Sequence, residues 1–251
     1  MITRYEGAVK GVLDLSYRKD STIRLSNGKE GTMERADRQK EKILKCAHRL
    51  FLEQGFSATT TREIAAAAEI QKGLLHYYFP KKDDIMGAMF EGILEGLFEY
   101  LNTRSRELNG VSFYAALNLL LITLLTSEEG PGSYMLETPE HRATTELKIR
   151  KLSDIASRVV EENRLDLPEY PVFLAVAASV GAETELFLNI QSNKARMTYR
   201  KLAILGNKIF FTLLKIPEHE IIEINRKAQT AVDGLDLTDL MAYLAGREAW
   251  L

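Results

Sequence analysis

The sequence predicts an all-α protein with two domains, and three observations support this prediction. From Asp37 onward, apolar residues recur three and four positions apart, which is the spacing of one helix face. No alternating pattern typical of β-strands follows residue 37. Breakers rich in glycine and proline, SEEGPGS at 127–133 and LDLPEYP at 165–171, divide the helical stretches. With 251 residues, 45% of them apolar, the chain can bury a substantial core.

Three helices are expected close together near the start of the periodic region. The first runs from Asp37 to Gly55, because glycine favours a helix end. The second follows Thr60, whose hydroxyl can cap free N–H groups while Glu63 completes a capping box. The third spans about 72–78 and is closed by a proline. Two short helices joined by a tight turn behind a longer one form the layout of a helix-turn-helix, whose second helix enters the major groove of DNA.

The remaining helices are longer and more apolar. An amphipathic helix over 83–108 is expected to connect the first unit to the rest of the chain. The stretch FYAALNLLLITLL at 113–125 is apolar on nearly all sides, so we expect it to be buried. An Arg-rich amphipathic helix over 139–163 and two apolar helices over 171–192 and 195–215 follow.

These last two helices carry small residues that permit the close approach of another helix, so they are the expected dimer interface. The side chains assigned to that interface are Val176, Val180, Phe187, Leu202, Gly206, Ile209 and Phe210. The tail over 217–251 holds two more amphipathic stretches, which could cover the dimer surface or cap the second domain. Residues 1–36 are expected to be a flexible extension or a mis-assigned start.

Composition limits the function further. The net charge is −2, yet residues 1–36 and 37–85 each carry two more basic than acidic side chains, which points weakly to a polyanionic partner. The single cysteine, Cys46, rules out an intrachain disulfide, and no His or Cys spacing resembles a metal site, so neither metal nor cofactor is expected. Because no run approaches a membrane span or a secretory signal, we expect a cytoplasmic protein without a membrane partner.

The stretch GFSATTTREIAAAAEIQKGLLHYYFPKKDDI resembles the DNA-binding signature of the TetR family of transcriptional regulators over about residues 38–85. Beyond residue 86 only the helical layout is similar. The resemblance implies a helix-turn-helix DNA-binding domain over 37–84, a helical effector-binding and dimerisation domain over 85–216, and the tail over 217–251. It also implies three partners, namely a double-stranded DNA operator, a small-molecule effector and a second copy of the chain.

The resemblance also implies which residues meet DNA. Phosphates accept hydrogen bonds from hydroxyls, helix-start N–H groups and lysines, whereas bases are read by the outer face of the second short helix. The residues assigned to DNA are Thr60, Thr61, Arg62, Gln71, Lys72, Gly73, Leu74, His76, Tyr77, Tyr78, Lys81 and Lys82. Packing is an equal alternative for Tyr77, and His76 alone is more often a surface histidine.

Four positions depart from the family pattern. Glu69 stands where the family commonly has glycine, because the backbone there tends to be left-handed, and its carboxylate brings negative charge toward DNA. Gln71, Leu74 and His76 also differ from the usual residues. Operator sequence therefore cannot be transferred from a relative.

Effector contacts are less sharply defined. The candidates are Phe98, Phe113, Leu117, Leu121, Arg150 and Glu183, and plain core packing is the alternative for the apolar ones. Glu183 lies in an apolar stripe and requires a partner, which could be a cationic ligand or, in preference, an arginine or tyrosine across the dimer interface. Arg150 could receive an anionic group, with a solvated face as the alternative.

The function expected from these observations is a homodimeric repressor that binds a pseudo-palindromic operator and is released by a small, largely apolar effector. A helical ligand- or partner-binding protein with a degenerate DNA-binding head is the alternative. No nucleophile, acid pair or metal spacing can be identified, so an enzyme is not expected.

Overall fold

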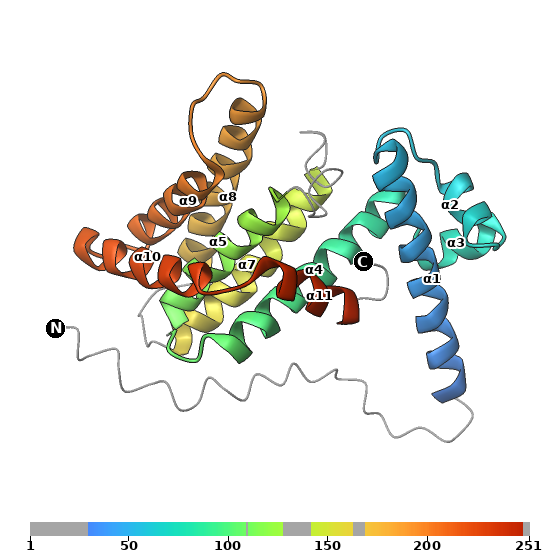
Figure 1. Ribbon diagram of the computed structural model, residues 1–251, viewed down its shortest axis with the longest axis horizontal. Helices are drawn as coiled ribbons and strands as arrows, with labels where there is room; N and C mark the ends of the chain where they lie inside the picture. The colour runs from blue at the N-terminus through green and yellow to red at the C-terminus, as the bar shows by residue number, and fades with distance from the viewer. Residues whose placement is uncertain (1–29, 109, 128–141, 163–168, 248–251) are drawn as a thin grey trace.

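The computed structural model describes residues 30–108, 110–127, 142–162 and 169–247, all of whose regular elements are helices (Figure 1). The first four are α1 (Glu30–Gln54), α2 (Thr61–Ala67), α3 (Lys72–Tyr78) and α4 (Lys82–Arg104). The next four are α5 (Gly110–Leu125), α7 (Arg142–Glu162), α8 (Glu169–Gln191) and α9 (Tyr199–Leu213). Two more, α10 (Glu218–Asp233) and α11 (Leu237–Arg247), complete the described chain. The expected all-α fold is confirmed.

The helices form two groups joined by α4. Figure 1 shows α1, α2 and α3 gathered at one end of the molecule, and α4 running from them into a larger bundle. We call α1–α3 the head and α5 with α7–α10 the bundle. The predicted domain boundary at residue 84 stays a prediction, since α4 passes through it without a break.

Helix α1 begins earlier than the sequence pattern suggested. It starts at Glu30, inside the segment expected to be flexible, rather than at Asp37. The intervening sequence EGTMERA contains no proline and several good helix formers, so nothing local stops the helix from extending backward. The rest of the expected extension, residues 1–29, lies outside the described residues.

Helix α5 is the centre of the bundle, as its apolar sequence predicted. It packs against α4, α7, α9 and α10, and most of its side chains are buried. The helix pair α8 and α9 covers one side, and α7 packs on α4, α5 and α8. This arrangement explains why α5 lacks a polar face, since each side of the helix meets another helix.

One described segment, Pro171–Gln191 in α8, is long and apolar enough to cross a membrane by length and composition. A core helix of a globular bundle passes the same test, and α8 packs against α7 and α9. Its inner face also holds the buried Glu183, which favours the reading as a bundle helix.

The tail resolves into two helices with different positions. Helix α10 packs on α5 and α9 and so caps the bundle, whereas α11 returns to α4 (Figure 1). Leu240 and Leu244 of α11 are buried, and a Cβ at Gly96 of α4 would overlap Leu244. Glycine at position 96 therefore permits the close approach of α11 to α4.

Polar contacts also stabilise the packing of α11 on α4. The Tyr100 hydroxyl donates to the Asp239 carboxylate at 2.9 Å, and Arg104 pairs with that carboxylate at 3.0 Å while lying 4.0 Å above the Tyr100 ring. Arg247 pairs with Glu99. Burial, with the bond to Asp239, raises the pKa of Tyr100 to about 12, so its hydroxyl stays a donor at neutral pH.

We predict that Leu244→Ala lowers the free energy of unfolding by about 2–5 kcal/mol, because the truncated side chain leaves a cavity against α4. Urea unfolding followed by circular dichroism measures the loss. Leu237→Ala, at a partly exposed position of the same helix, is the control and should cost much less. Equal losses in the two variants would contradict the docking of α11 on α4.

Candidate functional site

The head is built on a buried cluster that fixes α2 against α3. Ile64 and Ala65 of α2 and Leu75 of α3 are buried, and Phe79 closes the cluster after α3. The capping box predicted at the start of α2 is present. Thr60 Oγ1 accepts from the Glu63 amide at 3.2 Å, and the Glu63 carboxylate accepts from the Thr60 amide at 2.7 Å. Hydrogen bonds to the Glu63 carboxylate from the Thr60 hydroxyl, at 2.7 Å, and from the Thr60 amide hold the pKa of Glu63 below its usual value.

The turn between α2 and α3 contains the expected left-handed residue. Glu69 has a φ of 53°, and the amide of Ile70 donates to the carbonyl of Ala65 at 2.9 Å, which closes the end of α2. The Glu69 carboxylate pairs with Lys42 of α1 at 2.9 Å, which lowers the pKa of Glu69. The negative charge expected to oppose DNA is therefore matched by a lysine of the same head.

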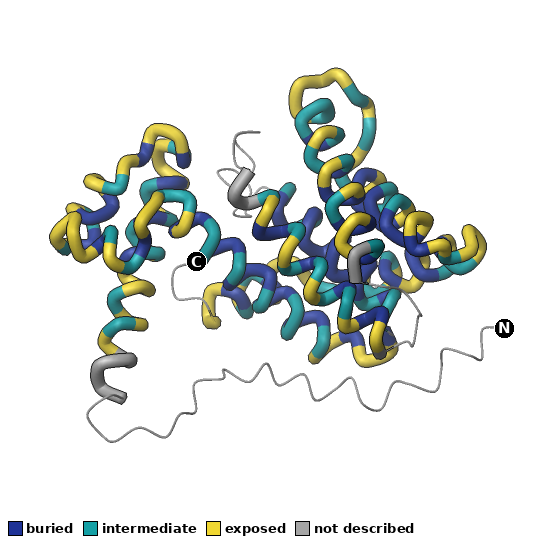
Figure 2. The backbone as a smooth tube through the Cα atoms, turned by 180° about the vertical axis from the view of Figure 1, so that it is seen from behind, coloured by how far each residue is buried: buried dark blue, intermediate teal, exposed yellow. Residues whose placement is uncertain are grey.

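Helix α3 presents a continuous exposed face. Gln71, Lys72, Gly73, Leu74 and Tyr77 are exposed, with Leu74 at 40% and Tyr77 at 78% of full exposure. The alternative that Tyr77 is packed away is thus wrong. Helix α3 lies at the end of the molecule away from the bundle, and Figure 2 shows exposed segments at that end.

Two neighbouring aromatic residues have more restricted positions. His76 is half-buried, and its Nδ1 lies 3.1 Å from the carbonyl oxygen of Pro80, so Nδ1–H donates there and fixes the end of α3. Tyr78 is half-buried and packs edge-on against Tyr77, with ring centroids 5.3 Å apart. His76 is therefore tied to the chain following α3 rather than free to read a base.

The two lysines after α3 face different ways. Lys82 Nζ donates to the carbonyls of Phe56 at 2.6 Å and Thr59 at 2.7 Å and lies 4.2 Å from the centre of the Phe56 ring. Burial lowers the pKa of Lys82, opposed by Asp83. Lys81 is exposed. Lys82 thus holds the α1–α2 loop, and the phosphate contact expected of it is not open in this structure, whereas Lys81 is free to make one.

The start of α2 completes the exposed surface. Thr60 and Arg62 are exposed, and Thr61 is half-buried. Together with the face of α3 and Lys81, these residues make up what we call the head surface: Thr60, Arg62, Gln71, Lys72, Gly73, Leu74, Tyr77 and Lys81.

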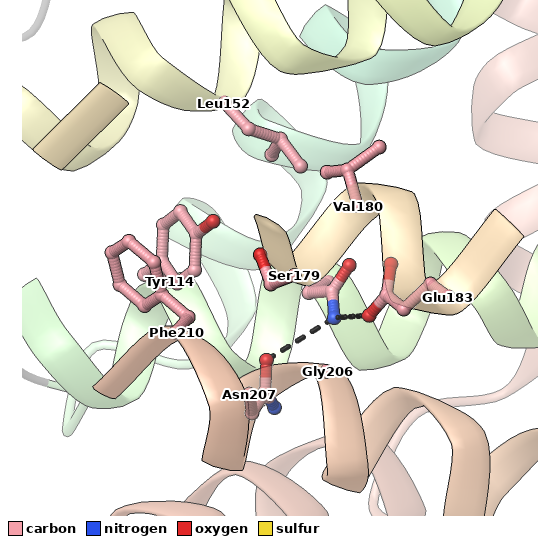
Figure 3. A pocket seen from close by; sticks show the side chains of 9 residues that line it. Tyr114, Leu152, Ser179, Val180, Glu183, Gly206, Asn207 and Phe210 are labelled. Carbon is pink, nitrogen blue, oxygen red and sulfur yellow. Dashed lines mark hydrogen bonds between the residues drawn. The ribbon is translucent and has the colours of Figure 1, made fainter. Parts of the chain in front are cut away.

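A narrow cavity lies inside the bundle between α5, α7, α8 and α9 (Figure 3). It is so thin that no water-sized sphere fits within it. Its lining combines apolar and polar side chains: Tyr114, Asn118, Leu152, Ser179, Val180, Glu183, Gly206, Asn207 and Phe210. Tyr114 and Phe210 are stacked with ring centroids 4.4 Å apart.

A chain of buried polar groups passes along one wall of the cavity. Lys148 Nζ pairs with Glu183 at 2.8 Å, and Asn118 Nδ2 donates to the other Glu183 oxygen at 2.7 Å and to Asn207 at 3.1 Å. Asn207 donates in turn to Asn225 of α10 at 3.0 Å. We call these five residues the polar chain. It crosses α7, α8, α5, α9 and α10, so it touches every helix of the bundle.

Only one of the predicted effector residues lines this cavity. Glu183 does so, and its partner is Lys148 of the same chain rather than a residue across a dimer interface, which corrects that expectation. Leu117 and Leu121 are fully buried core, and Phe98 packs edge-on against Phe113. Arg150 is exposed on α7. Lys148 could not be identified as the partner from the sequence, because it lies 35 positions from Glu183 and on another helix.

The residues assigned to a dimer interface are mostly on the wrong face. Val176, Val180, Phe187, Leu202, Gly206 and Phe210 are buried inside the protomer, and only Ile209 is partly exposed. The periodicity identified an apolar stripe but could not tell whether it faces the bundle or a partner. The outer face of α8 and α9 instead exposes Phe173, Leu174, Ala178, Gly181 and Leu213.

The head matches a known protein family. A family model described as bacterial regulatory proteins, tetR family, matches residues 43–89, which span the end of α1, all of α2 and α3, and the start of α4. The head is a tetR-family domain. This confirms the resemblance seen in the sequence, at the helix-turn-helix where it was strongest.

Curated HTH-type transcriptional regulators match parts of this chain. A probable HTH-type regulator of Bacillus subtilis, YttP, is 28% identical over 123 residues, or 49% of this chain and 54% of that protein. The regulator QacR of Staphylococcus aureus is 46% identical over 46 residues, or 18% of this chain and 24% of that protein. The chain therefore spans about half the length of the first of these relatives and about a quarter of the second.

Solved structures extend the similarity of fold beyond the head. RolR in complex with resorcinol superposes with a TM-score of 0.54 at 16% identity, covering 76% of this chain and 95% of RolR. The Thermus thermophilus repressor FadR in complex with lauroyl-CoA gives 0.53 at 20% identity, covering 71% of this chain and 96% of FadR. At these identities the likeness shows the fold, namely a tetR-type head on a helical bundle.

We predict that Lys82→Ala destabilises the tetR-family head by about 1–3 kcal/mol, because the carbonyls of the α1–α2 loop lose a charged donor. Lys81→Ala, the neighbouring exposed lysine, should stay within about 0.5 kcal/mol of the wild type. Thermal and urea unfolding distinguish the two. A stable Lys82→Ala protein would show that Lys82 does not hold the loop.

We also predict that Glu69→Gly is stabilising by up to about 1 kcal/mol, since glycine adopts the left-handed conformation without a Cβ penalty. Glu69→Gln is the matched variant, because it removes the charge and keeps the backbone demand. Glu69→Gln should lower the free energy of unfolding slightly, because it breaks the exposed ion pair with Lys42. Equal stabilities for the two variants would mean that the backbone conformation costs nothing here.

Proposed function

We propose that this protein is a ligand-responsive transcriptional repressor, which binds a pseudo-palindromic operator as a homodimer and releases it when a small effector enters the bundle. The observation that carries the proposal is the exposed face of α3 in a tetR-family head. Gln71, Lys72, Leu74 and Tyr77 are exposed at this helix while the buried Leu75 packs against the rest of the head. Such a helix can enter a major groove and offer donors and an apolar contact to base edges.

The basic side chains of the head surface favour contact with DNA phosphates. Lys72 and Lys81 lie beside the face of α3, Arg62 lies on α2, and the one acidic residue of the turn is matched by Lys42. The capping box leaves the first turn of α2, with its free N–H groups, beside the same surface. Repression rather than activation is favoured because occupancy of a promoter is enough to block it.

A dimer follows from the size of an operator. Recognition of two half-sites requires two α3 helices about 34 Å apart, which one chain does not supply. The outer face of α8 and α9 is the proposed contact between copies, because Phe173, Leu174 and Leu213 are exposed there beside the small residues Ala178 and Gly181. The inner face of these helices, where the sequence predicted the interface, is buried in the bundle.

Ligand response is supported by the cavity in the bundle and by neighbours of the same fold that hold resorcinol and lauroyl-CoA. No catalytic activity is proposed, because the buried charges of the cavity are already paired with one another. The proposed place of action is the cytoplasm, where a bacterial operator lies. The second candidate, a ligand-binding protein with a degenerate head, rests on Leu74 and on the tied His76.

We predict that the purified protein binds its own upstream DNA more tightly than a scrambled duplex of equal length, with an affinity that falls steeply and linearly in log salt. Fluorescence anisotropy over a salt series measures both. Lys72→Ala and Tyr77→Ala should weaken the specific complex without unfolding the protein, because both side chains are exposed.

Ile222→Ala is the control, since Ile222 is similarly exposed but lies on α10 of the bundle. Lys81→Ala should lower the salt slope by about 1 if Lys81 meets a phosphate. Equal binding to both duplexes, or no effect of Lys72→Ala and Tyr77→Ala, would favour the degenerate head over the repressor.

A further inference from the structure

We infer that the bundle cavity is a site for a compact, electrically neutral ligand with an apolar body and at least one hydrogen-bond donor, such as a hydroxyl or an N–H group. This inference rests on the proposed function only where it connects the ligand to DNA release. The hydrogen bonds that the cavity residues already make limit the chemistry of the ligand (Figure 3).

The hydrogen-bond donors of the polar chain that face the cavity already have acceptors within the protein. Both hydrogens of the Asn118 amide are engaged, by Glu183 and Asn207. Both hydrogens of the Asn207 amide are engaged as well, by the Ala115 carbonyl at 3.1 Å and by Asn225. The hydroxyl of Ser179 donates to the Val176 carbonyl at 2.9 Å. A ligand that needs donors from these amides would have to break existing bonds.

The acceptors, in contrast, have capacity left. Asn118 is 96% buried, at 4% exposure, and its Oδ1 has no hydrogen-bond partner. A carboxylate has about four acceptor positions, and the described bonds to Glu183 use one at each oxygen. A buried acceptor without a partner costs free energy, so a donor brought by a ligand would be stabilising at this wall.

The paired charges beside the cavity favour an electrically neutral ligand. Glu183 is already balanced by Lys148 at 2.8 Å, so an added anion or cation would leave one uncompensated charge in the interior. Tyr114 contributes no charge either, because burial and the nearby Glu183 carboxylate raise the pKa of its phenol. Its neutral hydroxyl can still accept or donate.

The apolar wall and the size of the cavity define the rest of the ligand. Leu152, Val180 and Phe210 line the cavity together with residues of the polar chain. Because no water-sized sphere fits, a ligand must move a wall. Helix α7 carries Leu152 and also Leu147, which lies 3.7 Å from where a Cβ on Gly87 of α4 would be. Displacing α7 would therefore shift its contact with α4, the helix that bears the head.

Four probes of similar size test the chemistry on the full chain without DNA. Phenol and toluene differ by a hydroxyl in place of a methyl group, and benzoate and benzylammonium add opposite charges. Calorimetric titration of each probe gives its affinity. We expect phenol to bind about tenfold more tightly than toluene, and both ions to bind more weakly than phenol.

Three variants locate the site. Leu152→Phe adds bulk to the wall that a ligand must displace and removes no group of the polar chain, so phenol binding should be lost, with circular dichroism as the check on folding. Asn118→Leu removes the unpartnered acceptor and should abolish the preference for phenol over toluene, with circular dichroism as the check on folding. Arg150→Ala, on the exposed side of the same helix as Leu152, is the control and should bind phenol as the wild type does.

The inference is overturned if toluene binds as well as phenol, if either ion binds best, if no probe binds, or if Leu152→Phe retains phenol binding. Its failure is separable from that of the proposed function, because the titrations contain no DNA. A protein that binds phenol but shows no operator preference would keep the cavity site and lose the regulatory role.

Discussion

The buried ion pair between Lys148 and Glu183 constrains the whole bundle. Glu183 is 3% exposed and lies on the inner face of α8, where an unpaired carboxylate would be strongly destabilising. Lys148 satisfies one of its oxygens and Asn118 the other, which fixes α7 and α5 against α8. Gly206 of α9 follows from the same requirement, since a Cβ there would collide with the Glu183 carboxylate. One charged group thus determines the positions of four helices.

The position of α7 affects the head through α4. Helix α4 carries the head and packs against both α7 and α11. On one side α7 brings Leu147 to Gly87, and on another α11 brings Leu244 to Gly96. The head is attached at the start of α4, where Lys82 holds the α1–α2 loop. A ligand can alter DNA binding through this helix only if it binds one placement of α7 better than another. In the proposed ligand site beside the ion pair, a ligand would have to displace a wall, and α7 is one of the helices that form it.

The local features of the head could be predicted from the sequence because short-range chemistry determines them. The capping box of Thr60 and Glu63 and the buried Leu75 and Phe79 follow from residue type and spacing. The left-handed turn at Glu69 was expected from the family resemblance, since glutamate itself does not indicate it. The direction of Lys82 could not be predicted, because a flexible lysine reaches either solvent or a nearby carbonyl. Its neighbour Lys81 has the same residue type and is exposed.

In the bundle, the sequence predicted the helices but not what they face. The apolar stripe of Val176 and Val180 is equally compatible with a core and with a dimer surface, and it proved to be core. The partner of Glu183 lies on a different helix, so no periodicity within α8 identifies it. The same limitation left the tail undecided, until α11 was found against α4 rather than over the outer face of α8. Long-range pairing of this kind depends on the three-dimensional arrangement of the helices.

A double-mutant cycle on Lys148→Met and Glu183→Gln, measured by urea unfolding, tests the central role of the ion pair most directly. The account predicts that Lys148→Met alone loses about 3–5 kcal/mol, because it leaves a buried charge unpaired. The double variant should recover at least about 2 kcal/mol of the summed single losses. Losses that add within about 0.5 kcal/mol would show that the two side chains are not coupled, and would contradict the role given to the pair.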